Sequence, residues 1–273
     1  MPFSMRCQTA TMRKARLSKP PARHRVAFTV RSYDVDIAHR LRLVVLNRML
    51  QEAAWQHALL LGKGFIDKAA GGYYWVLARL RLSIDSLPEW GDTFTIETYP
   101  VGTDRMFALR EFTILDNDGN SIGRATSGWL VVDAGRQRPV RPEALVADLD
   151  LSQPCYPGST GKLVPPGDST RFGPFPVRLH DIDQYRHVNN TAYLEWILDC
   201  MADSGRGASV SPLDDTDNQP SRCVELRMDF LQEAVLTDQY VIDVETGVRH
   251  VLAEVRRTRD NQPCCRCELS WQG

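Results

Sequence analysis

A short pattern occurs twice in this chain, about 147 residues apart, and the same order of predicted elements follows each copy. Tyr-Asp-Val-Asp (residues 33–36) precedes an apolar helix and a run of strands, and so does His-Asp-Ile-Asp (residues 180–183). One helix followed by antiparallel strands is an α+β unit. The repeat therefore predicts an α+β chain of two similar domains, in which each long helix is wrapped by its own curved antiparallel sheet.

Residue periodicity predicts the elements of both copies. Apolar residues at helical spacing indicate helices over residues 39–61 and 190–204. Period-two alternation between turn residues indicates strands at residues 26–30, 74–85, 94–98, 106–115 and 122–132, then around Val177 and at residues 222–231, 240–246, 250–258 and 264–271. We divide the chain into a basic, disordered tail (1–22), an N-terminal domain (23–145), a linker (146–172) and a C-terminal domain (173–273).

The N-terminal tail is rich in arginine, and no acidic residue precedes Asp34. Such a leader resembles an organellar transit peptide, although a disordered tail or upstream sequence read from too early a start is the simpler interpretation. We therefore predict a cytoplasmic protein, with plastid-type targeting as the alternative. No apolar run approaches the roughly 20 residues that span a bilayer, and a net charge of −1 does not favour nucleic acid as a partner. We predict neither membrane nor nucleic-acid binding.

Seven scattered cysteines fit a reducing compartment better than a disulfide framework. Cys264, Cys265 and Cys267 form a cluster that could be read as a metal site. It lies in a predicted strand, however, and no second cysteine pair at zinc-finger spacing accompanies it. We predict no metal and no cofactor.

The segment before the second helix concentrates polar groups that can move protons or hold a carbonyl: Asp181, Asp183, His187, Asn189 and Asn190. Asn is a good N-cap because its side-chain oxygen accepts hydrogen bonds from the first turn. The free N–H groups and macrodipole of a helix N-terminus favour negative charge. A developing oxyanion would be stabilised at such a place.

This segment, Asp-x-Asp-x-x-x-His-Val-Asn-Asn (181–190), stands between a strand and a helix, and antiparallel strands follow the helix. With its two copies of that arrangement, the chain resembles the acyl-ACP thioesterase family, which implies a double hot-dog fold. The resemblance covers residues 25–271. It also includes segments of the first half: Gln51-Glu52, His57, Trp75-Val76-Leu77-Ala78-Arg79, Pro88-Glu89-Trp90-Gly91-Asp92, Arg110-Glu111-Phe112, Ala125-Thr126-Ser127-Gly128-Trp129 and Arg138-Pro139.

The resemblance implies hydrolysis of the thioester between a fatty acyl chain and acyl carrier protein (ACP), with the chain bound by the N-terminal domain. The family uses an Asp, an Asn and a His spaced two apart, and a Glu from a later strand. Asp183 and His187 match this pattern, Asp229 falls at the Glu position, and Tyr185 stands where the family has Asn. Asn189 or a helix N–H group could replace that Asn. The implied catalytic set is Asp183, Tyr185, His187, Asn189 and Asp229.

Several roles and readings stay open. We expect Asp229 to face water as general base, His187 to orient the water or protonate the leaving thiolate, and Asp183 to hold the histidine or the loop. Each could instead be purely structural. Asp229 could be an ordinary strand residue, His187 a loop histidine and Asp183 a turn residue. Phe230 follows Asp229 where plant members have a cysteine, so a cysteine nucleophile has no candidate.

Large apolar residues could line an acyl tunnel or belong to an ordinary core: Met49, Trp55, Trp75 and Phe107. Four arginines could meet the acidic carrier protein: Arg178, Arg186, Arg222 and Arg227. The competing functions are an acyl-CoA thioesterase of the hot-dog superfamily and, because of Tyr185, a non-catalytic acyl-ACP-binding protein. We expect a monomer, which would be a pseudo-dimer, or a homodimer.

Overall fold

A computed structural model of the chain describes residues 21–64, 72–152, 154, 161–203 and 222–272. The elements of the first half are β1 (His24–Thr29), α1 (Leu43–Leu60), β2 (Tyr73–Ile84), β3 (Thr93–Asp104), β4 (Phe107–Leu115), β5 (Ser121–Asp133), β6 (Arg138–Val140) and α2 (Glu143–Val146). Those of the second half are β7 (Thr170–Pro176), η2 (Leu179–Asp181), α3 (Asn190–Asp203), β8 (Arg222–Phe230), β9 (Gln239–Thr246), β10 (His250–Arg257) and β11 (Pro263–Gln272).

All the strands belong to one antiparallel sheet, in the order β1-β3-β4-β5-β2-β8-β11-β10-β9-β7, with β6 paired to β5. The order in one half repeats the order in the other, because β1, β3, β4, β5 and β2 correspond to β7, β9, β10, β11 and β8. The halves join where β2 pairs with β8, with Arg81 opposite Arg227. These two arginines stand at equivalent places of the repeat, about 146 residues apart. The join therefore lies close to a pseudo-twofold axis.

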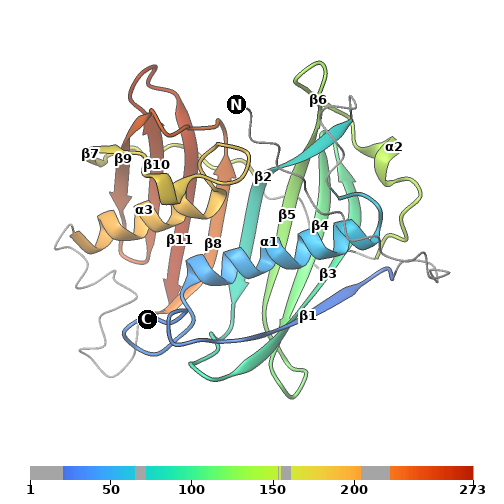
Figure 1. The fold of residues 1–273 in the computed structure, drawn as a ribbon. Helices are drawn as coiled ribbons and strands as arrows, with labels where there is room; N and C mark the ends of the chain where they lie inside the picture. The colour runs from blue at the N-terminus through green and yellow to red at the C-terminus, as the bar shows by residue number, and fades with distance from the viewer. Residues whose placement is uncertain (1–20, 65–71, 153, 155–160, 204–221, 273) are drawn as a thin grey trace, which may run out of the picture.

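Both long helices lie on the same face of this sheet (Figure 1). The side of α1 that faces the sheet buries mainly aliphatic residues, such as Leu46 and Leu50, in a core cluster that also holds Leu80 and Leu82 of β2. Two polar side chains on the helix, Asn47 and His57, are fully buried as well. The buried side of the helix is thus mainly apolar, with one polar group near each end.

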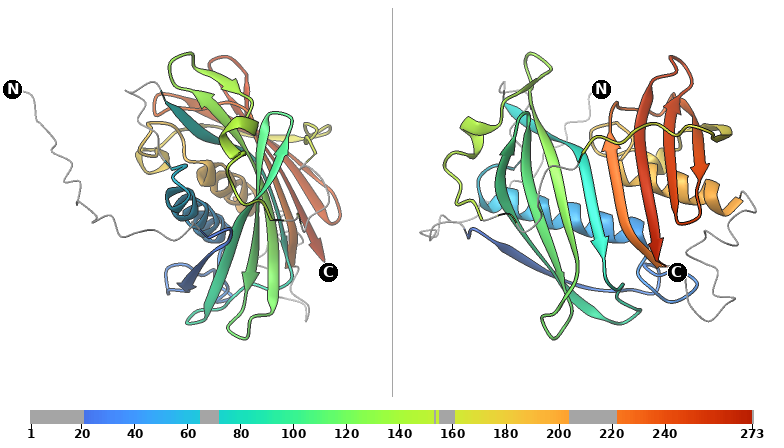
Figure 2. Two further views of the ribbon diagram at one scale, coloured as in Figure 1. Left: turned by 90° about the vertical axis from the view of Figure 1, so that its right-hand side faces the viewer. Right: turned by 180° about the vertical axis from the view of Figure 1, so that it is seen from behind.

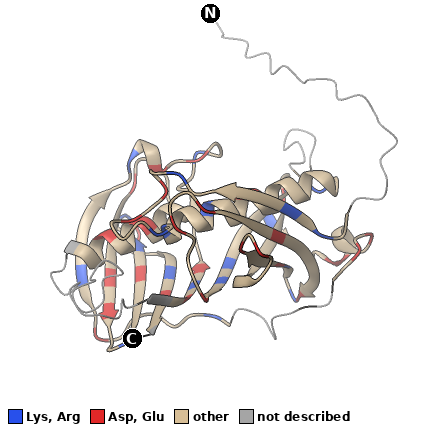
Figure 3. Cartoon of the chain, turned by 90° about the horizontal axis from the view of Figure 1, so that it is seen from below, with Lys and Arg blue, Asp and Glu red and all other residues tan. Residues whose placement is uncertain are grey.

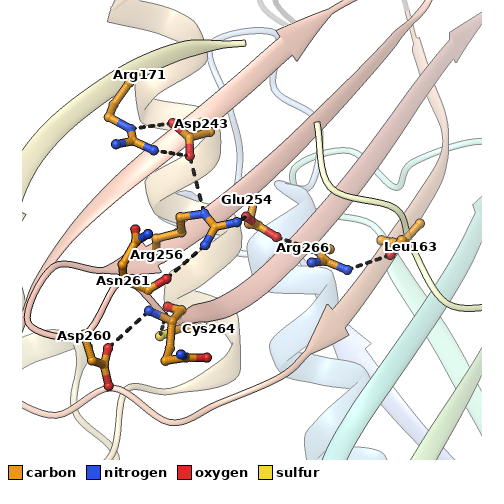
Figure 4. A network of polar contacts seen from close by, with 10 residues as sticks. Leu163, Arg171, Asp243, Glu254, Arg256, Asp260, Asn261, Cys264 and Arg266 are labelled. Atoms are coloured by element: carbon orange, nitrogen blue, oxygen red, sulfur yellow. Dashed lines mark hydrogen bonds and ion pairs between the residues drawn. The ribbon is translucent and has the colours of Figure 1, made fainter. Parts of the chain in front are cut away.

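Charged residues of both signs stand on neighbouring strands of the sheet (Figure 3). In the C-terminal half they form a chain of contacts (Figure 4): Arg171 pairs with Asp243 at 2.7 Å, and Arg256 joins Asp243 to the buried Glu254. Arg266 completes the chain, with its Nε 2.5 Å from Glu254. Alternating signs let a charged sheet face pack without unpaired buried charge.

Part of the segment before β7 crosses this charged face (Figure 2, right). Leu163 is buried there, its N–H donates to Asp229 Oδ2 at 2.8 Å, and its carbonyl accepts from Arg266 at 3.0 Å. The sequence predicts only a linker at residues 146–172. Around Leu163, however, this segment is a strip of chain that hydrogen bonds hold against the sheet.

The predicted helices and most predicted strands are confirmed to within a few residues. Two predicted strands are wrong in extent. The strand predicted at residues 94–98 continues to Asp104. Its pairing with β4 shifts register at a bulge between Pro100 and Gly102 and then resumes. The strand expected around Val177 is β7, which ends at Pro176. The tail before residue 21 and the polar loop at residues 205–220 lie outside the described residues, and the domain division stays a prediction.

Candidate functional site

The loop between η2 and α3 is folded by the carboxylate of Asp183. Its Oδ1 accepts the backbone N–H of Tyr185 at 2.8 Å, and its own N–H donates to the carbonyl of His187 at 2.9 Å. Arg186 takes a positive φ of 68° to close the turn. This is an Asx-type turn. Asp183 thus holds the loop in this structure, and its part in catalysis stays a prediction.

The turn presents His187 to a carboxylate that we did not select from the sequence. His187 Nε2 lies 3.1 Å from Glu233 Oε2; the His187 side chain is partly buried, and that of Glu233 is exposed. The backbone around Glu233 is fixed on two sides, because Arg257 donates to its carbonyl and Val188 N donates to the carbonyl of Ala234 at 2.8 Å. A histidine and a carboxylate held at hydrogen-bond distance can act together in proton transfer.

A cavity of about 450 Å³ opens beside this pair. Asp183, Tyr185, His187 and Glu233 line one end. From there it runs along the side of α1, bounded by strands β2, β4 and β5, where its walls are mainly apolar: Ala54, Trp55, Ala58, Trp75, Leu77 and Trp129. Trp55 and Trp75 are thus placed as the tunnel reading expects, whereas Met49 and Phe107 are not among the lining residues. The shape suits a long apolar chain with its reactive end at His187.

Asp229 is not brought to this group. It is 3% exposed, so the expectation that it faces water is wrong. Its carboxylate lies on the charged sheet face, where it accepts the N–H of Leu163 and lies 3.8 Å from Arg79 Nε. Side chains alternate between the faces of a strand, and this position of β8 points away from the helices and the cavity.

Tyr185 and Asn189 both line the cavity. Tyr185 is 37% exposed, and its pKa is raised by burial and by the nearby carboxylate of Asp183, so its hydroxyl stays protonated as a donor. Asn189 caps α3, as expected, since its Oδ1 accepts the N–H and the hydroxyl of Thr191 at 2.9 and 2.8 Å. The N–H of Thr191 is therefore occupied, and that of Ala192 donates to the carbonyl of Asn189 at 2.9 Å.

The first copy of the loop has the same backbone and different chemistry. Asp36 Oδ1 accepts N–H groups of Ala38 and Arg40, as Asp183 does with Tyr185 and His187. Arg40 thus stands at the place of His187, and His39 stacks on Trp90. In the second half, Trp196 stacks on Tyr240 beneath α3, with ring centroids 3.8 Å apart. We therefore find one histidine–carboxylate pair beside one long cavity in the described residues.

Sequence reasoning missed Glu233 because it sought a carboxylate inside a strand. Glu233 lies three residues beyond the end of β8, in a turn. It is the next carboxylate after Asp229, and that proximity in sequence was the available signal. Cys264, Cys265 and Cys267 are buried. Among the residues that the structure describes, no group of three or more His, Cys, Asp or Glu side chains could hold a metal ion.

Comparison with known proteins agrees with this geometry. The family models for the acyl-ACP thioesterase N-terminal domain and C-terminal domain match residues 21–148 and 166–205. The chain belongs to the acyl-ACP thioesterase family. It is 31% identical over 210 residues to oleoyl-acyl carrier protein thioesterase 2, chloroplastic, of Arabidopsis thaliana, a match that covers 70% of this chain and 57% of that protein. The chain thus spans little more than half the length of this relative.

Two solved structures of acyl-ACP thioesterases share the double hot-dog fold of this family. The enzyme from Bacteroides thetaiotaomicron matches with a TM-score of 0.80 and 24% identity, over 94% of this chain and all of that one (100%). The 12:0-ACP thioesterase from Umbellularia californica matches with a TM-score of 0.76 and 19% identity, over 92% of this chain and 98% of that one. At these identities the likeness confirms the predicted fold. No helix of the described residues is long and apolar enough to cross a membrane.

Proposed function

We propose that this acyl-ACP thioesterase family member hydrolyses fatty acyl-ACP and releases the free fatty acid. The observation that carries the proposal is the pair of His187 and Glu233, 3.1 Å apart beside the long cavity. A thioester at that place would have its acyl chain alongside α1 and its pantetheine arm toward solvent. Family membership supports the same reaction.

In the proposed mechanism, Glu233 and His187 act together on water. The carboxylate takes a proton from the water as its oxygen attacks the thioester carbonyl carbon, a role typically worth about 10²–10⁴ in rate. The Tyr185 hydroxyl stabilises the oxyanion of the tetrahedral intermediate. Glu233 passes the proton it took from water to His187, and His187 gives that proton to the thiolate when the C–S bond breaks, which restores both groups. Asp183 keeps the loop folded, and Asn189 caps the helix. Glu233 thereby takes the role expected of Asp229.

The proposed partner is ACP carrying its acyl chain. Arg178 and Arg186 are exposed in and beside the loop of His187, where an acidic carrier would approach. Arg227 lies on the far face of the sheet, paired with Glu268 at 2.6 Å, and the side chain of Arg222 lies outside the described residues. A cytoplasmic location, a monomer or homodimer, and the absence of other partners stay predictions.

Thiol release from matched acyl-ACP and acyl-CoA substrates tests the proposal. We expect a higher kcat/KM for acyl-ACP, and a loss of roughly 10²–10⁴ in kcat for His187→Ala with acyl-ACP binding retained. A clear preference for acyl-CoA would mean that the substrate is acyl-CoA and not acyl-ACP. Saturable acyl-ACP binding without thiol release would instead indicate a non-catalytic binding protein, and gain of activity in Tyr185→Asn would trace that loss to Tyr185.

A further inference from the structure

A buried arginine holds the turn that carries Glu233. Arg257 is the last residue of β10, and it donates from Nη1 to the carbonyl of Glu233 and from Nη2 to Gln232 Oε1 at 3.0 Å. Asp260 accepts from the same guanidinium, from Nε at 3.1 Å and from Nη2 at 2.7 Å. The N–H groups of a guanidinium form a rigid fork, so these bonds together fix the place of the Glu233 carbonyl.

Arg257 leaves the reactive carboxylate to the histidine. The ion pair of Arg257 is with Asp260, whereas the carboxylate of Glu233 lies 3.1 Å from His187. The Glu233 side chain is 54% exposed, so water competes for its oxygens. A glutamate in that setting keeps its contact with the histidine only when the backbone that carries it is fixed.

The first copy of the repeat builds the same turn after β2. Three backbone N–H groups hold each turn at equivalent places: Asp85 and Ser86 to the carbonyl of Ile122 and Leu41 to that of Pro88 in the first copy, and Leu231 and Gln232 to the carbonyl of Cys264 and Val188 to that of Ala234 in the second. Leu87 therefore occupies the position of Glu233. The backbone bonds alone form this turn when no carboxylate has to be placed.

The first copy also lacks the arginine. At the end of β4, Asp116 N donates to the carbonyl of Asn120 at 2.9 Å. At the end of β10, Arg257 N donates to the carbonyl of Gln262 at 3.0 Å, so Asp116 occupies the position of Arg257. Among the described residues, no side chain donates to the carbonyl of Leu87. The arginine thus accompanies the carboxylate of the second copy and is not part of the turn that both copies share.

We propose that Arg257 is a positioning residue for the reaction, which holds the carbonyl of Glu233 and so keeps its carboxylate within hydrogen-bond reach of His187. Asp260 orients the guanidinium in turn. A general base must lie at that distance from its partners, and a displacement of about 1 Å can cost about 10² in rate. This role rests on the proposed thioesterase function and adds to it a residue that does not line the cavity.

Thiol release from acyl-ACP by Arg257→Met tests the role, in the wild-type chain and in Glu233→Gln. In the wild-type chain we expect kcat to fall about 10- to 100-fold with an unchanged KM. In Glu233→Gln the same substitution should cause no further loss, because it acts through that carboxylate. Arg257→Lys should recover part of the loss. Arg249→Met, exposed just before the other end of β10, should leave kcat unchanged.

An unchanged kcat in a folded Arg257→Met would overturn the proposal, and an equal loss in both backgrounds would show a general structural role instead. Failure of Arg257→Met to fold would also overturn it, because the first copy builds the same turn without an arginine.

A crystal structure of Arg257→Met gives the distance from His187 Nε2 to Glu233 Oε2 without any turnover. We expect the contact to be lost, and a contact kept at 3.1 Å would contradict the proposed role. If the wild type released no thiol from acyl-ACP, that result would count against the thioesterase function alone, and this distance would still decide the role of Arg257.

Discussion

The side chains of the site differ in how far the sequence reveals them. Asp183 and His187 were found because a local turn fixes both, and spacing within one loop is readable from the chain. Glu233 was missed because its place depends on Arg257 and Val188, which hold its turn from other segments. Asp229 was chosen instead because sequence alternation does not say which face of β8 meets the cavity.

His57 gives a prediction at the scale of one residue. It is fully buried, and burial lowers its pKa to about 4, whereas the unfolded chain restores an ordinary pKa of 6.5. As the pH falls below about 6.5, the unfolded chain therefore binds the proton first. The stability contributed by neutral His57 is complete above that pH and is lost toward pH 4, by roughly 3 kcal/mol.

The free energy of unfolding measured at about pH 7 and about pH 4.5 checks this. The decrease between the two should be about 2 kcal/mol larger in the wild type than in His57→Gln, which does not titrate. This variant keeps an acceptor for Arg110, whose Nη1 lies 3.0 Å from His57 Nδ1. Equal decreases in the two proteins would show that His57 is not held neutral. Carboxylates titrate in both proteins, so their contribution to the decrease cancels in the comparison.

At the scale of elements, periodicity located α1, α3 and most strands, because each has one buried face. It did not reveal that β2 pairs with β8, since partners in a sheet are chosen by contacts about 146 residues apart in the chain. Nor did it reveal the strip of chain around Leu163. Proline, glycine and serine dominate that region, and the composition gave no sign of a buried leucine.

That strip predicts a stability effect in a segment that looks like a linker. Leu163 is 4% exposed, so Leu163→Ala should lower the free energy of unfolding by roughly 2–4 kcal/mol. The neighbouring Val164 is 65% exposed, and Val164→Ala should change it by less than about 0.5 kcal/mol. Denaturant unfolding of the two variants checks this. Equal small changes would mean that the strip is not fastened to the sheet in solution.

For the whole molecule, the duplicated fold is used asymmetrically. The second copy supplies Asp183, His187 and Glu233, and the first supplies most of the cavity walls, along the side of α1. Arg40 stands where the first copy would need its histidine, and stacked Trp196 and Tyr240 lie beneath α3. The repeat in the sequence predicted the two halves. The different contributions of the two halves became clear only from the structure, in which Arg40 of the first loop occupies the position of His187 in the second.

The most direct test of this account is thiol release from acyl-ACP by Glu233→Gln, with Asp229→Asn as the matched variant. Each change removes one carboxylate charge and keeps the size of the side chain. We predict a loss of roughly 10²–10⁴ in kcat for Glu233→Gln, and near-normal kcat for Asp229→Asn, whose side chain lies on the far face of the sheet. Near-normal activity in Glu233→Gln together with loss in Asp229→Asn would contradict the account.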